Sequence, residues 1–381
     1  MKSKKRILIY SDRPNWAYDN IGKAVAHDLS DHADFYFDYC CCHLYKIEKK
    51  SIYLIIKQDI HRSIKNFKSF FYLNQLFDWN YSFLNYTFTP FWKRKILINS
   101  VWFERSVLPP WKKYDIIFYF DFYFDRYANL SKNGKRIIKG IYTDSFPPKC
   151  LDLDYLSILR DERILFDIDI HSFYLKYLSD ASLLSCGSVN VVNTFSDIPI
   201  KKLFLNYIKG EDQFYIVPKD YSKTIVIGWT GNPNREFKNY YSVIVPAINH
   251  LIAEGFDIIL KSRFEGPYDT LPRFYDDVHL IVIASDGDSG PSMFAEASLS
   301  GIPAISTKIG FPNIVIEDGV NGFFFDLGLD QLIEKITEIY FNRSKLVNAS
   351  KLIRLDYSAK MGNEILLKNW KEAFELECAE S

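Results

Sequence analysis

The fold is decided in the second half of the chain, where an apolar run at residues 279–284 is followed by the stretch SDGDSGPSMFAEASLSGIP at residues 285–303. The apolar run is typical of a buried parallel strand, and the two glycines that follow it predict a loop. Pro291 suits the first turn of a helix, which we expect over 292–299, and a second strand is expected over 304–306. This order of strand, loop, helix and strand is the repeating unit of a doubly wound α/β fold.

Two carboxylates in this stretch flank the expected helix start. Backbone N–H groups at a helix start favour an anion such as a diphosphate. Glu296, one turn into the helix, can accept hydrogen bonds from ribose hydroxyls, as acidic residues do in dinucleotide sites. Asp288, on the loop before the helix, can bind hydroxyls of a sugar beyond the phosphates. A nucleotide sugar is the ligand class that suits this spacing.

The same alternation of strands and helices extends to both sides. In the second half we expect strands over 224–227 and 256–260, a loop over 228–234 and a helix over 243–251. In the first half we expect strands over 7–10, 34–39, 115–120, 136–142 and 189–192, with a helix formed around Ile21, Val25 and Leu29. The sequence therefore predicts two successive α/β units.

Length and composition agree with two domains. The chain has 381 residues, of which 48% are hydrophobic, enough for two cores. We expect an N-terminal domain over 1–215, a C-terminal domain over 216–357 and a terminal helix over 358–381. The formal net charge is zero, which argues against a protein that binds nucleic acid through bulk charge.

The sequence predicts a cytoplasmic protein. The apolar run at residues 7–10 is too short for a signal peptide, and we find no run of about 18 apolar residues for a spanning helix. Cys40, Cys41 and Cys42 are adjacent and precede His43, but there is no C-x2-C pair, so neither a metal site nor a disulfide framework is expected. A reducing compartment fits this cysteine usage.

The stretch at 285–303 resembles the retaining glycosyltransferases of the GT-B fold, specifically glycosyltransferase family 4, also called glycosyl transferases group 1. Their hallmark is a Glu, seven residues, a second Glu followed by Ala, and then Gly-x-Pro. Asp288 stands at the first of these positions and Glu296 at the second. The resemblance covers roughly 225–326. It implies two Rossmann-like domains that face each other across a cleft, with a C-terminal helix that crosses back to the N-terminal domain.

The resemblance also implies a set of site residues. The implied catalytic residues are Asp288, Glu296, Lys238 and Asp144. The implied donor-binding residues are Gly231, Asn232, Arg235, Lys238, Ser285, Asp288, Ser289, Gly290, Pro291, Ser292 and Glu296. The implied acceptor-side residues are Asn15, Trp16 and Asp144.

Three positions depart from the family pattern. Asn232 stands where the family has an arginine, so Arg235 is expected to take its place. The family's Glu after a Gly-Gly loop is missing, since residues 311–314 read FPNI. Many members have a His at the end of an N-terminal strand, and here Asp144 is expected in that role.

The family reaction moves a sugar from a nucleotide diphosphate sugar to an acceptor with retention of configuration. For this chain the resemblance implies a glycan or lipid-linked acceptor, a role in bacterial surface polysaccharide synthesis, and no metal or other cofactor. Asp286 and Asp288 formally make the Asp-x-Asp pattern of a metal–diphosphate site. We interpret it instead as the family's Ser-x-x-Glu, because Ser285, Pro291 and Glu296 are in register with it.

Other classes of protein remain as alternatives. An oxidoreductase that uses a dinucleotide should have G-x-G-x-x-G after its first strand, but no glycine occurs between Tyr10 and Gly22. A GT-B enzyme that epimerises or phosphorylates sugars, or a non-catalytic protein that binds nucleotide sugars, shares the same fold. Release of free nucleoside diphosphate from a nucleotide sugar separates a transferase from the binding protein.

A basic aromatic stretch at residues 45–113 interrupts the first α/β unit. It contains 13 Lys or Arg and 4 Asp or Glu, together with four tryptophans. Ile56, Ile60, Ile64, Phe67 and Phe71 recur at helical spacing, and lysines flank them. An interfacial helix has this pattern, and so does a helix that covers a sheet with its lysines in solvent. We favour the first, which would hold the protein at the inner face of the cell membrane.

We therefore predict that the protein co-sediments with anionic vesicles at low salt. Changing Lys57, Lys65 and Lys68 together to Glu should release it, because each basic residue near an anionic surface contributes about 1 kcal/mol. Equal binding of this variant, or no binding of the natural protein, would instead indicate a soluble acceptor.

Overall fold

The structure is a computed structural model that describes residues 4–12, 17–40, 95–98, 101–104, 106–108, 112–125, 133–147 and 168–376. For 95–98 and 101–104 it describes the backbone alone. Asn15, Trp16, the expected helical face at 56–71 and the adjacent pair Cys41 and Cys42 lie outside these ranges.

The chain falls into two compact units. Unit 1 comprises Met1–Gly140, Tyr177–Leu184 and Phe374–Ser381, and unit 2 comprises Ile141–Lys176 and Ser185–Ala373. Both contain parallel strands with helices between them, so the expectation of an α/β fold with two Rossmann-like domains is confirmed. The first sheet ends in the chain at Phe204 and the second begins at Ile225, on either side of the expected boundary at 215. That boundary stays a prediction.

The first sheet has the strand order β2-β1-β5-β6-β7-β8. Its strands are β1 (Lys5–Ser11), β2 (Ala33–Tyr39), β5 (Tyr114–Tyr119), β6 (Gly134–Ile141), β7 (Leu183–Cys186) and β8 (Lys201–Phe204), with the helices α1 (Ala17–Asp28), α7 (Ile170–Tyr177) and α8 (Val189–Thr194) between them. Strand β1 pairs in parallel with β2 and β5, for example Ile7 with Phe35 and with Ile116. Because residues 7–10 of β1 are fully buried, the strand is apolar on both faces, as a central parallel strand requires.

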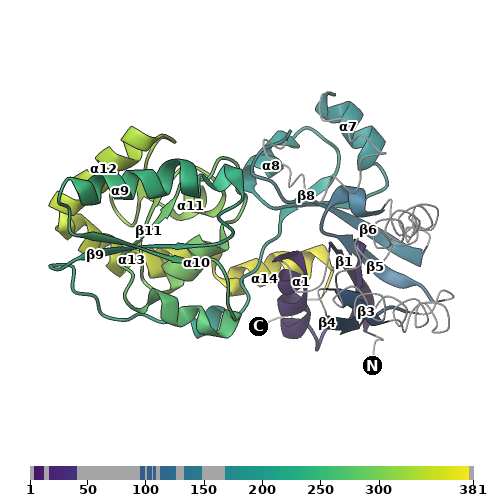
Figure 1. Ribbon diagram of the computed structural model, residues 1–381. Coiled ribbons are helices and arrows are strands. Elements are labelled where there is room, and N and C mark those ends of the chain that lie inside the picture. Colours follow the sequence, from purple (N-terminus) through teal and green to yellow (C-terminus); the bar gives the residue numbers. More distant parts are fainter. Residues whose placement is uncertain are drawn as a thin grey trace, which may run out of the picture. The chain divides into compact units, whose positions relative to one another are not determined.

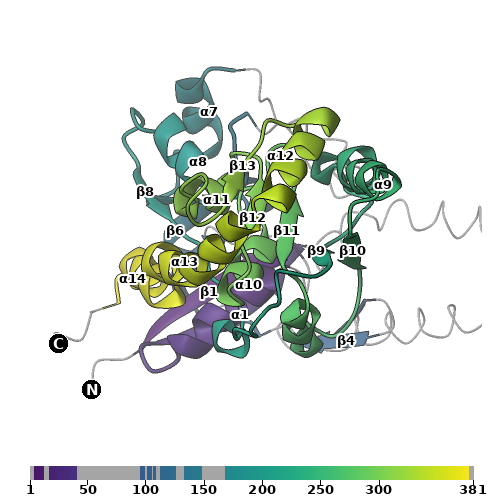
Figure 2. The ribbon, with the colours of Figure 1, turned by 90° about the vertical axis from the view of Figure 1, so that its left-hand side faces the viewer.

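The second sheet lies wholly in unit 2 and has the order β10-β9-β11-β12-β13. Its strands are β9 (Ile225–Thr230), β10 (Ile258–Arg263), β11 (Leu280–Ile283), β12 (Ala304–Ser306) and β13 (Phe323–Phe324). The α-helices after β9 are α9 (Val245–Ala253), α10 (Ser292–Leu299), α11 (Gly310–Val315), α12 (Leu329–Phe341), α13 (Arg343–Met361) and α14 (Asn363–Ala373). Figures 1 and 2 show α9 and α12 packed together on one face of this sheet, and α10 and α13 on the other.

Most of the expected elements are confirmed, with three corrections. Val189–Thr194 is the helix α8, because the Ser188 hydroxyl accepts a hydrogen bond from the Val191 N–H and caps it; the strand expected at 189–192 is wrong. Strand β9 continues through Gly228 to Thr230, so the loop expected from 228 begins three residues later. The expected terminal helix is broken at Gly362, where the backbone is extended between α13 and α14.

The chain returns to unit 1 after α14. Phe374 packs against Phe35 and Phe118, with ring centroids 5.9 and 6.0 Å away. Lys5 and Arg136 both pair with Glu375. The residues directly after α14 therefore belong to unit 1, whereas α14 itself belongs to unit 2.

Two further features concern the first domain. The strands β3 (Lys95–Ile98) and β4 (Val101–Glu104) pair antiparallel, and both lie inside the basic aromatic stretch. Lys139 of β6 is buried between Asp125 and Asp180, at 2.6 Å from each, so its charge is compensated inside the domain. Among the described residues, no helix combines the length and apolar character needed to cross a bilayer.

Candidate functional site

The predicted donor residues gather at the carboxyl edge of the second sheet. Strand β9 lies between β10 and β11, so the chain moves to opposite sides of β9 as it continues. In open parallel sheets, ligands bind outside the carboxyl ends of the strands at such a reversal. The loops after β9 and β11 contain most of the predicted site residues.

The loop after β9 is held against the end of β11. Asn239 adopts a left-handed conformation with φ 51°, and its side chain donates a hydrogen bond to the carbonyl of Ala284 at 2.9 Å. The N–H of Asp286 donates to the carbonyl of Phe237 at 2.8 Å. These two contacts bring Lys238, which lies between Phe237 and Asn239, to the segment that contains Asp288.

Lys238 and Asp288 form an ion pair. The Lys238 Nζ lies 2.9 Å from the Asp288 Oδ2, and both side chains are mostly buried, with exposed fractions of 17% and 16%. The second oxygen of Asp288 accepts the N–H of Gly290 at 3.4 Å. The two residues for which the resemblance implies contacts to the diphosphate and to the sugar are thus in direct contact, and the lysine has a compensating charge close by.

Glu296 is buried in the helix that follows this loop. All residues of α10 from Met293 to Leu299 are buried, and Glu296 is only 3% exposed. Burial raises the pKa of its carboxyl group to about 7, against the hydrogen bond from Tyr275 and the charges of Arg263 and Lys238, which lower it. The Tyr275 hydroxyl donates this hydrogen bond to the Glu296 Oε2 at 2.8 Å. Glu296 therefore titrates near neutral pH.

A third loop, after β12, closes on the same segment. The Thr307 hydroxyl donates to the carbonyl of Ser285 at 2.7 Å. The N–H of Gly310 donates to the Asp144 Oδ1 at 2.9 Å, and the Asn190 side chain donates to the same oxygen at 3.3 Å. The Ser289 hydroxyl donates to the carbonyl of Tyr142 at 3.2 Å. Asp144 lies in unit 2 with these residues, and its carboxylate binds the first N–H of α11.

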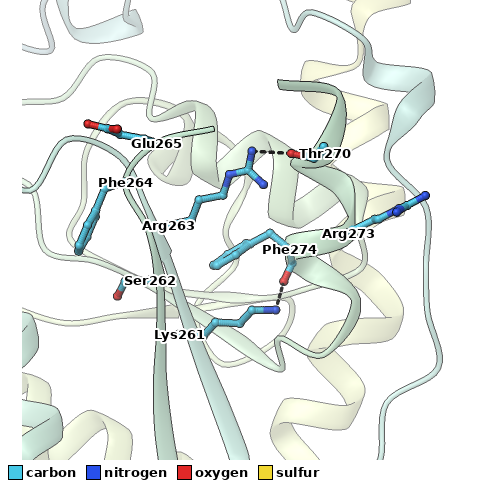
Figure 3. Close-up of a pocket in the computed structure, with 8 residues that line it drawn as sticks. All are labelled: Lys261, Ser262, Arg263, Phe264, Glu265, Thr270, Arg273 and Phe274. Atoms are coloured by element: carbon cyan, nitrogen blue, oxygen red, sulfur yellow. Dashed lines mark hydrogen bonds between the residues drawn. The ribbon is translucent and has the colours of Figure 1, made fainter. Parts of the chain in front are cut away.

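An open pocket of about 680 Å³ lies beside the end of β10 (Figure 3). It is lined by Lys261, Ser262, Arg263, Phe264, Glu265, Thr270, Arg273 and Phe274. Arg263 donates to the Thr270 hydroxyl at 2.8 Å and Lys261 to the carbonyl of Phe274 at 2.9 Å, which Figure 3 marks. Arg263, which lines this pocket, also lowers the pKa of Glu296 through its charge.

The other predicted residues differ in their exposure. Ser285 and Pro291 are buried, whereas Asn232 and Ser292 are exposed. The Arg235 guanidinium lies 5.8 Å from the centre of the Phe237 ring, on the same loop as Lys238. Pro291 precedes the first residue of α10 as its N-cap rather than lying in its first turn. The structure therefore brings Lys238, Asp288 and the loop at 285–291 together, while Asn232 and Ser292 remain at the surface.

Sequence reasoning missed Tyr275, Arg263 and the pocket. Arg263 lies three residues beyond the strand expected at 256–260, although β10 extends to it, and basic residues near strand ends are too common to indicate a site. Tyr275 lies in the run LPRFYDD at 271–277, which has no recognisable motif. A tyrosine directly before two aspartates gives no indication that its hydroxyl contacts a residue 21 positions further along the chain.

Sequence reasoning also missed a polar cluster in unit 1. The Tyr18 hydroxyl donates to the Asp121 Oδ2 at 3.1 Å, and that of Tyr123 lies 3.4 Å from the same oxygen. Burial raises the pKa of Asp121 to about 8, and the charge of Asp12 adds to this, while both tyrosine hydrogen bonds lower it. Asp12 and Asp121 follow the neighbouring strands β1 and β5. Within the described ranges, no group of three His, Cys, Asp or Glu side chains is arranged to hold a metal ion.

Part of the second half of the chain matches a family model. Residues 252–355 match the model of the family described as glycosyl transferases group 1. This range includes Asp288 and Glu296 but not Lys238. No curated protein sequence matches the chain.

Solved structures with the same fold align with almost the whole chain. TarM aligns over 98% of this chain and 99% of its own, with 13% identity and a TM-score of 0.57. HepE of Anabaena with UDP-glucose aligns over 97% and 99%, with 13% identity and a TM-score of 0.56. The lipopolysaccharide outer core galactosyltransferase WaaB aligns over 97% and 99%, with 13% identity and a TM-score of 0.52. The likeness establishes the GT-B fold, and with the family match it supports a glycosyltransferase of class EC 2.4.

We predict that Gly310→Ala disrupts the site. Gly310 has φ +32°, and a Cβ there would lie 2.2 Å from the Ser289 carbonyl oxygen and 2.6 Å from that of Asp288. Overpacking costs about 1–3 kcal/mol of unfolding free energy in addition to the cost of the left-handed backbone, about 1–2 kcal/mol.

Gly319→Ala is the matched control. Gly319 has φ +78° with nothing within 4 Å of an added Cβ, so this variant should lose only the backbone part. Chemical denaturation and transfer activity measure the two variants. Equal loss of stability in both, with activity unchanged in Gly310→Ala, would show that the contact of the two loops does not matter.

Proposed function

We propose that the protein is a retaining glycosyltransferase that moves a sugar from a nucleotide diphosphate sugar to a glycan or lipid-linked acceptor. The observation that supports this best is the ion pair of Lys238 and Asp288 at the point where the strand order reverses. The buried Glu296 lies in the helix that follows Asp288. A cation and two carboxylates in this order match the phosphate, sugar and ribose of such a donor.

Lys238 would bind the diphosphate. Its ammonium group donates up to three hydrogen bonds, and one of them goes to Asp288. As the bond between the anomeric carbon and the phosphate oxygen breaks, negative charge develops on the leaving nucleoside diphosphate. A lysine already held at that position stabilises this charge without reorganisation. Arg235, on the same loop, would supply the second cation in place of the family arginine.

Asp288 and Glu296 would bind the two sugars of the donor. Glu296 would accept hydrogen bonds from the ribose hydroxyls, and Asp288 would accept them from the transferred sugar once phosphate shares Lys238. The carboxylate form of Glu296 is the acceptor, so its raised pKa matters for binding. Donor affinity should therefore fall as the pH falls through about 7.

The ligands of proteins with the same fold are consistent with this donor. HepE has been solved with UDP-glucose, and S. aureus TarM with UDP and α-GlcNAc-glycerol. For this chain we propose a nucleotide sugar as donor and a glycan as acceptor. Asn15, Trp16 and Asp144 remain our proposed acceptor-side residues, and an inner-membrane surface remains a proposed partner through the basic aromatic stretch.

We expect Glu296→Gln and Asp288→Asn each to lower transfer about tenfold to a hundredfold, because a hydrogen bond to a charged group contributes about 1.5–3 kcal/mol. Glu334→Gln, an exposed carboxylate on α12, is the control and should leave transfer unchanged. Release of nucleoside diphosphate from a panel of nucleotide sugars measures the rate. Near-normal rates in both site variants would reject the proposal.

We also predict that transfer does not need a divalent metal, because Lys238 and Arg235 supply the positive charge at the diphosphate. Activity in excess EDTA should equal activity in buffer alone. Loss of activity in EDTA, restored by manganese or magnesium, would instead assign Asp286 and Asp288 to a metal–diphosphate site.

A further inference from the structure

Tyr275 contacts Glu296 in a way that neither the sequence nor the family match assigns. Tyr275 lies in the 3-10 turn Pro272–Asp276 and is 1% exposed. Its hydroxyl donates to the Glu296 Oε2 at 2.8 Å. Burial raises the pKa of Tyr275 well above its usual value, although the Thr230 side chain at the end of β9 lowers it. The Tyr275 hydroxyl therefore links the 3-10 turn directly to Glu296 in α10.

The contact fixes one oxygen of the carboxylate and leaves the other for a ligand. Among the described residues, Tyr275 is the one hydrogen-bond partner of the Glu296 carboxylate. A glutamate side chain has three rotatable bonds, so an unheld carboxylate would sample several positions. Held at Oε2, Glu296 presents Oε1 in one place.

The ring and the hydroxyl of Tyr275 have separate roles. The ring packs against Phe214 and Phe274, with centroids 6.2 and 5.1 Å away, and so belongs to the core of unit 2. The hydroxyl adds nothing to this packing. Removing the hydroxyl alone therefore tests positioning without removing the ring.

We propose that Tyr275 is a positioning residue for the donor: its hydroxyl orients the Glu296 carboxylate toward the ribose hydroxyls. This inference rests on the proposed function, since it takes a ribose as the group that Glu296 binds. Tyr275 itself does not touch the donor. It acts through Glu296.

Besides burial, three groups set the ionisation of the Glu296 carboxylate. Burial raises its pKa to about 7, while the Tyr275 hydrogen bond, Arg263 and Lys238 lower it. Tyr268 and Tyr357 also interact with it electrostatically, and burial raises the pKa of each well above neutrality, so both stay uncharged. Loss of the Tyr275 hydroxyl removes one of the three effects that favour the carboxylate. The Glu296 pKa should then rise further.

The experiment measures the affinity for UDP, and for GDP in parallel, between pH 6 and pH 9 by titration calorimetry. We expect Tyr275→Phe to bind about tenfold more weakly at pH 6.5, where the raised pKa leaves Glu296 protonated. At pH 9 the carboxylate is ionised in both proteins, and the loss should shrink to about twofold or threefold. Tyr240→Phe is the matched control, since it removes a buried hydroxyl whose partner is Ser262 at 2.7 Å, and its effect should not vary with pH.

A second comparison changes the ligand instead of the protein. The 2′,3′-dideoxy form of UDP lacks the hydroxyls that Glu296 would bind. If Tyr275 acts through Glu296, Tyr275→Phe should weaken UDP but leave the affinity for the dideoxy form nearly unchanged. Equal weakening of both ligands, or a loss that is constant with pH, would overturn the inference and leave Tyr275 as a packing residue.

Two further variants distinguish a folding defect and a failure of the proposed function from a failure of this inference. If Tyr275→Phe does not fold, 3,5-difluorotyrosine at position 275 keeps the ring and makes the hydroxyl a stronger donor, so UDP binding should then persist to lower pH. An unchanged pH profile would reject the proposal. Glu296→Gln distinguishes failure of the proposed function from failure of this inference. If this variant does not weaken UDP binding, or if neither nucleotide binds the natural protein, the proposed function fails and this inference fails with it. If Glu296→Gln weakens UDP and Tyr275→Phe does not, the inference alone fails.

Discussion

Parallel pairing of β9 with both β10 and β11 is the constraint on which unit 2 depends. Ile227 pairs with Leu260 on one side and with Leu280 on the other, so β9 has no exposed edge. The segment after β9 must pass over one side of the sheet and the segment after β11 over the other, which leaves a gap between their loops. Lys238 and Asp288 meet in this gap, and neither loop alone would bring a cation and a carboxylate together.

The surroundings of Glu296 also show how the cost of burying a carboxylate is partly offset. Taking a carboxylate out of water is costly, and burial alone would keep Glu296 largely protonated at neutral pH. One neutral donor, Tyr275, and two cations, Arg263 and Lys238, offset part of this cost. Each comes from a different segment of the chain, so the pKa of Glu296 depends on all three segments being in place.

The sequence was sufficient for the fold and for the elements around the loop at 285–291. Buried parallel strands such as residues 7–10 and 280–283 are continuous apolar runs, and Pro291 marks the start of α10, so local pattern is enough there. The strand expected at 189–192 was wrong because a β-branched apolar run favours a strand, whereas the Ser188 cap favours a helix and prevails. Tyr275 could not be predicted, since its role depends on a contact across 21 residues of sequence. Asp144 was singled out by its position, but its bond to the Gly310 N–H is visible only in three dimensions.

The close approach of Gly310 to the carbonyls of Ser289 and Asp288 has a consequence for protein engineering. A randomised library that seeks altered donor choice will usually diversify every codon of the loops around the ligand. Codon 310 should be held constant, because each of the other residues adds a Cβ where two carbonyl oxygens already lie, and those clones would be lost before selection begins. Diversity is better placed at Asn232 and Ser292, whose exposed side chains leave room for larger ones.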